Sequence, residues 1–270
     1  MALCKNVPGE VKGKMKKRIA IVTGASGGLG KEFVRQMLSE NVDEIWAVAR
    51  NKEKLEGLRA EWGERIVPFA GDLSSPEGVH ALCEKLGEQT PVIVYLVNNA
   101  GTGRMEEYEK SSVPEIEKTI YLNSTAVAVL SRACIPYMEP GGHIVNVASQ
   151  AAFQPLPFMT TYAATKAFVK NFTRALNVEL QDRKVVATAV CPGWIKTDLL
   201  PSFSKGKNPR FPGQVTAASV AVKAMKDVKK GRDMSVNTFG VKCMHLLAKL
   251  SPQRLISKAW LLYIRRYVGK

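Results

Sequence analysis

Tyr162 and Lys166 are the residues in this chain whose types and spacing most directly support proton-transfer chemistry. They stand four positions apart in the run Tyr-Ala-Ala-Thr-Lys, and on a helix two side chains at this spacing share a face. A lysine ammonium near a phenol favours the phenolate, which would bring a tyrosine with an ordinary pKa near ~10 closer to neutrality. Such a group can donate a proton to an alkoxide as it forms. The alternative is an ordinary amphipathic helix, where this spacing is common.

A second candidate site lies near the start of the chain, at residues 23–30, which read Thr-Gly-Ala-Ser-Gly-Gly-Leu-Gly. The apolar run Ile19–Thr23 precedes it and a helical pattern begins near Leu29. Glycines let a backbone approach a pyrophosphate closely, and a helix N-terminus offers free N–H groups and a positive dipole end. Glycines used only for packing are the alternative. The position at the first strand-to-helix junction favours nucleotide binding.

The residue after the second predicted strand indicates which nucleotide would bind. NAD-binding sites usually place an acid there, about twenty residues past the last glycine, to bind the adenine ribose. Here the strand ends at Ala49 and Arg50 follows. A guanidinium can chelate a 2′-phosphate, which a carboxylate would repel. We therefore predict NADP(H) rather than NAD(H); the alternative is that Arg50 only ends a strand in solvent.

The elements that must position these residues alternate along the chain. We expect strands at Ile19–Thr23, Glu44–Ala49, Ile66–Ala70, Val92–Val97, His143–Ala148 and Val185–Val190, and helices at about 29–40, 52–61, 75–87, 113–138 and 160–181. Such alternation predicts an α/β fold, a doubly wound, mostly parallel Rossmann-type sheet with helices on both faces. We expect a single domain over 1–270, with an N-terminal extension at 1–16 and a helical tail from about 236 to 270. Residues 201–213 are interpreted as a substrate loop or, equally, a solvated surface loop.

Composition and charge exclude some classes of function. The 270 residues carry a net charge of +15, of which residues 201–270 supply most, with 15 Lys and Arg against Asp227 and Asp233. The five cysteines are scattered without a C-x-x-C pair, which favours a reducing compartment, and we expect the cytoplasm. Three dispersed histidines predict no metal site. The basic quarter lacks a nucleic-acid reading motif, so we expect no specific nucleic-acid partner.

Together these motifs resemble the short-chain dehydrogenase/reductase family in its compact single-domain branch. The matching segments, in order, are Thr23-Gly-x-x-x-Gly28-x-Gly30, Gly71-Asp72-Leu73, Asn98-Asn99-Ala100-Gly101, Asn123, Ser149, Tyr162 with Lys166, and Pro192-Gly193 followed by Thr197. The resemblance covers roughly residues 17–235. Ala148 stands where many relatives have a second serine, and Thr102–Met105 does not resemble the continuation found in acyl-carrier-protein ketoreductases. We therefore give that substrate class less weight.

The resemblance implies a hydride transfer between NADP(H) and a ketone or secondary alcohol. In that mechanism Tyr162 is the proton donor or acceptor, and Lys166 lowers the pKa of Tyr162 and holds the nicotinamide ribose. Ser149 binds the reacting oxygen, and Asn123 positions a relay water. The predicted cofactor-binding residues are Gly24, Ser26, Gly28, Leu29, Gly30, Arg50, Asp72, Leu73, Asn99, Ala100, Gly101, Tyr162, Lys166, Pro192, Gly193, Ile195 and Thr197.

Apolar residues flank the predicted catalytic centre and indicate the substrate. Residues 151–159 and the loop after Gly193, with Trp194, Phe203 and Phe211, favour a hydrophobic ketone or alcohol over a free sugar. Lys205, Lys207 and Arg210 in that loop suit an anionic group on the substrate. A steroid or bile acid fits both features, as does a 3-oxoacyl thioester. An alternative of another class is a non-catalytic NADP(H)-sensing regulator.

The tail and the assembly state leave alternatives open. Residues 255–267 form an apolar stripe with basic residues at its edge. We favour a helix packed on its own core or at a subunit interface; the alternative is peripheral contact of 252–270 with an anionic membrane surface. The resemblance implies a homodimer or homotetramer.

Overall fold

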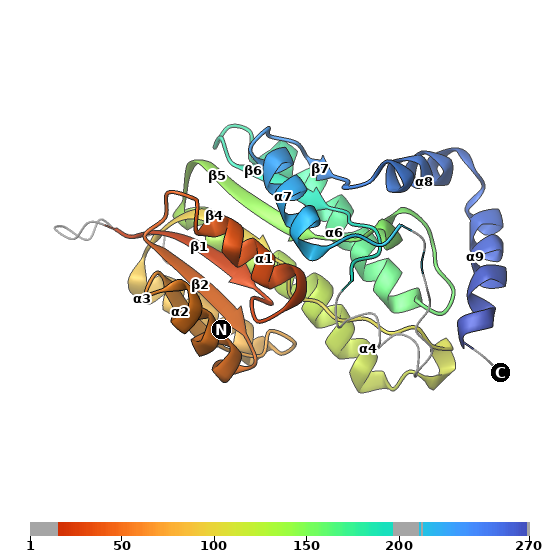
Figure 1. Cartoon of the computed structure of the whole chain (residues 1–270), viewed down its shortest axis with the longest axis horizontal. Helices are drawn as coiled ribbons and strands as arrows, with labels where there is room; N and C mark the ends of the chain where they lie inside the picture. The colour runs from red at the N-terminus through yellow and green to blue at the C-terminus, as the bar shows by residue number, and fades with distance from the viewer. Residues whose placement is uncertain (1–15, 197–210, 212, 269–270) are drawn as a thin grey trace.

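The computed structural model describes residues 16–196, 211 and 213–268, with side chains up to residue 265. Its centre is a sheet of seven parallel strands in the order β3-β2-β1-β4-β5-β6-β7, with helices on both faces (Figure 1). The predicted doubly wound α/β fold is therefore confirmed. Parallel strands joined by helical crossovers need both faces covered, because their side chains alternate between the two faces and both sets are apolar.

The strands are β1 Arg18–Thr23, β2 Glu44–Ala49, β3 Ile66–Ala70, β4 Val92–Asn98, β5 Met138–Val147, β6 Val186–Val190 and β7 Met234–Ser235. The α-helices are α1 Gly28–Met37, α2 Lys52–Trp62, α3 Pro76–Gln89, α4 Val113–Ile120, α5 Ala126–Cys134, α6 Thr160–Glu179, α7 Ala217–Val228, α8 Phe239–Leu250 and α9 Gln253–Val268. Short 3₁₀ turns occur at Tyr108–Lys110, Ile135–Tyr137 and Gln150–Phe153, and a π turn at Tyr121–Thr125.

Two hydrophobic layers hold the helices to the sheet. Alternate residues of β1 point to opposite faces: Ala20 and Val22 pack with α1, α2 and α7, whereas Ile19 and Ile21 pack with α3, α5 and α6. All four are fully buried. Burial of an Ile or Val side chain contributes about 1.5–3 kcal/mol, so this strand anchors both layers.

The topology fixes where a ligand can bind. The strand order reverses between β1 and β4, which pair in parallel beside each other. In open α/β sheets, ligands bind outside the carboxyl ends of the strands at this switch point. The glycine-rich turn follows β1, the Asn98–Gly101 segment follows β4, and Ser149 follows β5. All three therefore meet at one edge of the sheet.

One predicted helix is wrong. The expected helix at 113–138 is divided into α4 and α5 by the π turn, and its last four residues form the 3₁₀ turn Ile135–Tyr137 and the first residue of β5. The buried Asn123 lies in this turn, and its amide donates to the backbone oxygen of Thr102 and accepts from the Thr102 N–H. A buried amide needs such partners, and a π turn inserts one residue that redirects the side chain. The short strand β7 and helix α7 were not predicted.

The predicted helical tail is present, as α8 and α9, and it packs on its own chain as we favoured. On α9, Ile264 is fully buried and the Trp260 indole Nε1 donates to the Pro157 carbonyl at 2.9 Å. Figure 1 shows both helices at the end of the molecule opposite α2 and α3. Within the part of the chain that the structure describes, no helix is long and apolar enough to cross a membrane.

Candidate active site

The β1–α1 turn is shaped by glycines that leave no room for a side chain. Gly24 has φ +66, and a Cβ there would lie 2.8 Å from Asn99 Nδ2. A Cβ at Gly30 would lie 1.9 Å from the Gly24 carbonyl oxygen. Gly30 therefore holds helix α1 against the turn rather than lining a cavity. This is the close approach that the glycine spacing predicts.

Hydrogen bonds fasten this turn to the end of β4. The Thr23 hydroxyl accepts from the backbone N–H groups of Asn99 and Ala100, each at 3.0 Å. In return the Asn99 side-chain amide donates to the carbonyls of Thr23 (3.1 Å) and Gly24 (3.3 Å). These hydrogen bonds hold the β1–α1 turn and the end of β4 together at the switch point, although the two segments are far apart in sequence.

The N-terminus of helix α1 directly follows this glycine-rich turn. It begins at Gly28 without a side-chain cap and with no acidic residue in its first turn. The first N–H groups of a helix have no partner within the helix, and the dipole there is positive. An anion such as a pyrophosphate fits both features.

Arg50 and Asp72 lie beyond the ends of β2 and β3. The exposed Arg50 lines the same cavity as the glycine turn. Asp72 does not line that cavity, and its carboxylate accepts from the Ser74 backbone N–H (3.0 Å) and hydroxyl (2.8 Å). Burial alone would raise the pKa of Asp72, but the Ser74 hydrogen bonds and the nearby Arg50 lower it below the usual value. Leu73 is buried in the core.

Tyr162, on α6, is brought to Ser149 at the end of β5. The Ser149 hydroxyl accepts from the Ala151 N–H at 3.1 Å and also hydrogen-bonds the Tyr162 side chain. Burial raises the pKa of Tyr162, and the Ser149 hydrogen bond opposes that rise only in part. The sequence-based expectation of a lowered pKa is therefore wrong for this structure, because desolvation outweighs the effect of its neighbours.

Lys166 is the buried cation of the site. Its ammonium donates to the Val147 carbonyl at 2.7 Å and lies 5.8 Å from the centroid of the Tyr162 ring. Burial lowers the pKa of Lys166 to about 8. A Cβ at Gly101 would lie 3.3 Å from Lys166 Nζ and 3.2 Å from Asn123 Oδ1, so both side chains approach the backbone at Gly101.

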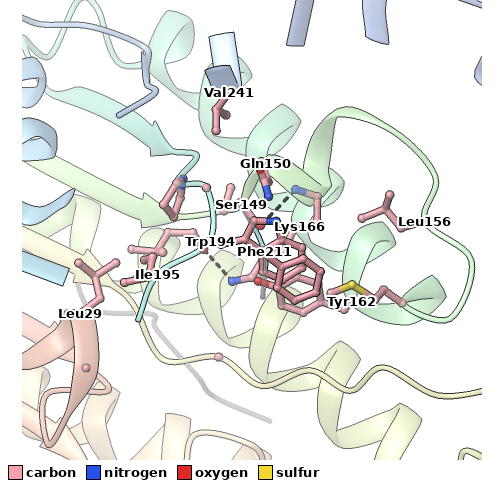
Figure 2. Close-up of a pocket in the computed structure, with 18 of the residues that line it drawn as sticks. Leu29, Ser149, Gln150, Leu156, Tyr162, Lys166, Trp194, Ile195, Phe211 and Val241 are labelled. Atoms are coloured by element: carbon pink, nitrogen blue, oxygen red, sulfur yellow. Dashed lines mark hydrogen bonds between the residues drawn. The ribbon is translucent and has the colours of Figure 1, made fainter. Parts of the chain in front are cut away.

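One cavity of about 900 Å³ joins these parts. Of the predicted residues, those lining it are Gly24, Ser26, Gly28, Leu29, Arg50, Asn99, Ala100, Gly101, Ser149, Tyr162, Lys166, Pro192, Gly193 and Ile195. Asn123, Gly30, Asp72 and Leu73 do not line it. Figure 2 shows Ser149, Tyr162 and Lys166 grouped between Leu29 and Ile195 on one side and Leu156 on the other. Thr197 lies outside the described residues, as do Lys205, Lys207 and Arg210.

The far end of the cavity has an aromatic wall of which the sequence analysis assigned only Trp194 and Phe211 to the site. Trp194 stacks on Phe211 with ring centroids 3.5 Å apart, and Trp260 and Tyr263 of α9 continue the wall. Helix α8 adds Val241 and Met244. The sequence analysis identified the apolar stripe on residues 255–267, but a sequence alone does not show that this stripe packs over the cavity. No group of three or more metal-ligating side chains occurs among the described residues.

Comparison with known proteins places this geometry in a family. Residues 18–208 match the short chain dehydrogenase profile. The chain belongs to the short-chain dehydrogenases. The match begins at β1 and extends past Ser149, Tyr162, Lys166 and the Pro192-Gly193 segment, so it contains every part of the catalytic group described above.

Two relatives and two solved structures show the range of short-chain dehydrogenases that this chain resembles. The NADP-dependent 3-hydroxy acid dehydrogenase YdfG of Salmonella typhi is 33% identical over 66% of this chain and 72% of the relative. The very-long-chain 3-oxoacyl-CoA reductase of Anas platyrhynchos is 30% identical over 69% of this chain and 64% of the relative.

The two structures cover most of both chains. A short-chain dehydrogenase from Sphingobium yanoikuyae in complex with NADPH has a TM-score of 0.76 at 27% identity, covering 89% of this chain and 95% of the other. The bulky-bulky ketone specific alcohol dehydrogenase of Comamonas testosteroni has a TM-score of 0.72 at 25% identity, covering 91% of this chain and 95% of the other.

Proposed function

We propose that this short-chain dehydrogenase reduces a bulky, hydrophobic ketone to a secondary alcohol with NADPH as the hydride donor. The observation that carries the proposal is the continuous cavity of about 900 Å³. It runs from the glycine turn, past Ser149, Tyr162 and Lys166, to the aromatic wall. A nucleotide end, a proton donor and an apolar pocket thus share one space.

The residues at the nucleotide end fit NADP(H). The uncapped N-terminus of α1 suits the pyrophosphate, and Arg50 supplies a cation at the place of the usual ribose-binding acid. The NADP dependence of the Salmonella relative and the NADPH complex of the Sphingobium neighbour support the same choice. When bound, the cofactor supplies the hydride.

The chain's own residues handle the proton. A phenol with an ordinary pKa near ~10 is protonated at neutral pH, and burial shifts the pKa of Tyr162 further in that direction, so Tyr162 has a proton to donate to the substrate oxygen. The Ser149 hydroxyl, hydrogen-bonded to that side chain, is placed to stabilise the developing charge on the same oxygen. Lys166 adds a positive charge nearby, and the buried Asn123 holds the Thr102 backbone beside it.

The apolar wall supports a bulky ketone, for which steroids and bile acids are the first candidates. Leu156, Met159, Trp194 and Phe211 line the pocket beyond Tyr162. The resemblance to a bulky-bulky ketone specific alcohol dehydrogenase agrees with a large pocket. The proposal that the substrate carries an anionic group depends only on Lys205, Lys207 and Arg210, which lie outside the described residues.

Reduction of 3-oxoacyl thioesters is the second candidate. It is supported by the resemblance to a very-long-chain 3-oxoacyl-CoA reductase. A long acyl chain is apolar and fits the same wall, so the wall does not separate the two substrates. A homodimer or homotetramer remains part of the proposal, supported by exposed apolar residues such as Phe168 and Val178 on α6. A cytoplasmic location is also part of the proposal, and the dispersed cysteines support it.

The decisive experiment follows NADPH absorbance while steroid and bile-acid ketones and 3-oxoacyl thioesters are offered in turn, with NADH in parallel. We expect turnover with NADPH that Tyr162→Phe lowers by about 10²–10⁴-fold while NADPH affinity is kept. Phe211→Leu, a variant of the wall, should alter the ranking of ketones instead. Tight NADPH binding without turnover would favour a non-catalytic sensor, and preference for NADH would refute the role given to Arg50.

A further inference from the structure

Helix α8 exposes its apolar side rather than burying it. Phe239, Cys243, Leu246, Leu247 and Leu250 recur at helical spacing and form one stripe. Every one of them is exposed, with Phe239 at 82% and Leu250 at 77%. Val241 and Ala248, on the other side of the helix, are buried against the rest of the chain.

Helix α9 repeats this arrangement. Its inner side carries Trp260 and Ile264, whereas Leu255, Ala259 and Leu262 form an outer stripe. Leu262 is 71% exposed. We call the two outer stripes together the apolar rim. Exposed apolar residues concentrated on two neighbouring helices mark a contact surface, since single scattered ones would need no explanation.

The charges beside the apolar rim have one sign. Exposed cations flank it at Lys242, Lys249, Arg254, Lys258 and Arg265. The sequence has no Asp or Glu after Asp233. A partner for this surface must therefore be both apolar and anionic.

A second copy of the chain does not meet that requirement. In a two-fold symmetric contact the same surface meets itself. The rim would then bring its five cations against five identical ones with no carboxylate from this segment between them. Like charges placed together disfavour such an interface.

We propose that the apolar rim docks the protein peripherally on an anionic lipid bilayer. The leucines of α8 and α9 enter the interfacial region, and the flanking lysines and arginines face the lipid phosphates. Figure 1 shows the two helices as the outermost elements at that end of the molecule, where a flat surface can reach them. Neither helix crosses the bilayer.

Docking would also bring the substrate cavity to the lipid. Met244 on α8 is 41% exposed and at the same time lines the cavity, so it stands at the boundary between them. The inner sides of both rim helices form the cavity wall, through Val241 and through Trp260 and Tyr263. An apolar ketone dissolved in the bilayer can then enter beside Met244. This last step rests on the proposed function, whereas docking itself does not.

Vesicle sedimentation of the full chain tests docking without any activity readout. The probes are phosphatidylcholine vesicles with and without phosphatidylglycerol. We expect binding to the anionic vesicles only, weakened by salt. One cation near such a surface is worth about fivefold in affinity, so Lys258→Gln with Arg265→Gln should weaken binding about 25-fold. Leu255→Asp with Leu262→Asp should reduce it at least tenfold, by about the loss of one buried leucine.

Matched controls lie on α7 and in the turn that follows it, outside the rim. Lys226→Gln with Lys230→Gln removes the same charge from exposed positions, and Val222→Asp changes an exposed aliphatic residue. Both should bind vesicles as the unaltered protein does. Equal losses in the control pair, or unchanged binding in the rim variants, would overturn the proposal. So would a dimer that the rim variants abolish while no vesicle is bound.

The entry step has its own readout. Turnover of a vesicle-dissolved ketone should fall in Leu255→Asp with Leu262→Asp, while turnover of a water-soluble ketone stays unchanged. Loss of both in a variant whose circular dichroism spectrum is unchanged would refute the entry step. Inactivity of the unaltered protein on every ketone would refute the proposed function but leave the vesicle result intact.

Discussion

At the scale of single residues, burial of the Lys166 ammonium lowers the stability of the folded protein. Burial lowers its pKa from 10.5 to about 8. Between these values the unfolded chain binds a proton that the folded chain does not, so stability rises with pH in that window. Below about pH 8 the folded protein carries the full cost of a buried ammonium.

Lys166→Met should therefore stabilise the protein at neutral pH. The pKa difference corresponds to about 3 kcal/mol, an upper limit because the hydrogen bond to the Val147 carbonyl is also lost. We expect a gain at pH 7 that shrinks as the pH rises from 8 toward 10.5, measured by urea unfolding, with activity lost throughout. Lys226→Met on the exposed side of α7 should change the unfolding free energy by less than about 0.5 kcal/mol at either pH. A destabilisation by Lys166→Met that does not vary with pH would contradict this account.

Arg50 carries the prediction of cofactor choice. It lines the cavity and is exposed, so its removal should leave the fold intact. Arg50→Ala should weaken NADPH binding by about 10–100-fold, the range of one or two charge-assisted hydrogen bonds, and leave NADH binding within about twofold. Fluorescence titration measures both constants. Arg59→Ala on α2 is the control; an equal loss for both nucleotides in Arg50→Ala would mean that Arg50 does not contact the 2′-phosphate.

Residue identity and spacing were enough to predict most of this site, but not its electrostatics. The serine, tyrosine and lysine converge as their spacing indicated. The predicted direction of the Tyr162 pKa shift was wrong because burial of the side chain decides it. That burial comes from elements distant in sequence, such as the loop after β4, where a Cβ at Gly103 would lie 2.4 Å from the Tyr162 ring. The expected contact of Asp72 with the cofactor stays a prediction; in this structure its carboxylate accepts hydrogen bonds from Ser74, two residues away.

At the scale of elements, a glycine required by close packing can be distinguished from one that only weakens a helix. Gly30 sits against the Gly24 carbonyl, whereas Gly57 in α2 has open space where a Cβ would be. Gly30→Ala should distort the turn, abolish nucleotide binding and lower the unfolding free energy by at least about 2 kcal/mol, because overpacking against backbone cannot relax. Gly57→Ala should raise it by up to about 1 kcal/mol through helix propensity.

Calorimetry and nucleotide titration of the two glycine variants provide the check. Gly27→Ala is an intermediate control, because that position precedes α1 in an extended conformation with nothing within 4 Å of a Cβ. It should leave the unfolding temperature nearly unchanged. If Gly30→Ala bound NADPH normally, the close contact between helix and turn would not be required.

The elements themselves were predictable where a regular period lasts for the whole element. The six predicted strands are present because each is a short apolar run between turns. The π turn could not be predicted, since Asn123 finds its partners at Thr102, far away in sequence. The two-residue strand β7 is held by pairing with β6 and carries no periodic signal of its own.

At the scale of the whole molecule, the C-terminal helices connect the family core to its pocket. The core that matches the family ends at residue 208, and the cavity wall is completed by α8 and α9 beyond it. Sequence periodicity showed that α9 has an apolar side, but what that side covers depends on how the chain returns over the carboxyl edge of the sheet. Part of the proposed substrate pocket is therefore built by a segment outside the matched family region.

Trp260 gives the last prediction, because it both fastens α9 and lines the cavity. Its indole donates to the Pro157 carbonyl at 2.9 Å and its ring lies 6.4 Å from that of Trp194. Trp260→Ala should lower the kcat/KM for a bulky ketone about tenfold or more, mainly through KM, since it removes apolar contact with bound substrate. A small ketone that does not reach the wall should keep its kcat. Trp260→Phe retains the ring without the indole N–H, so it should restore most of the KM if packing matters, and little of it if the hydrogen bond to Pro157 alone positions α9.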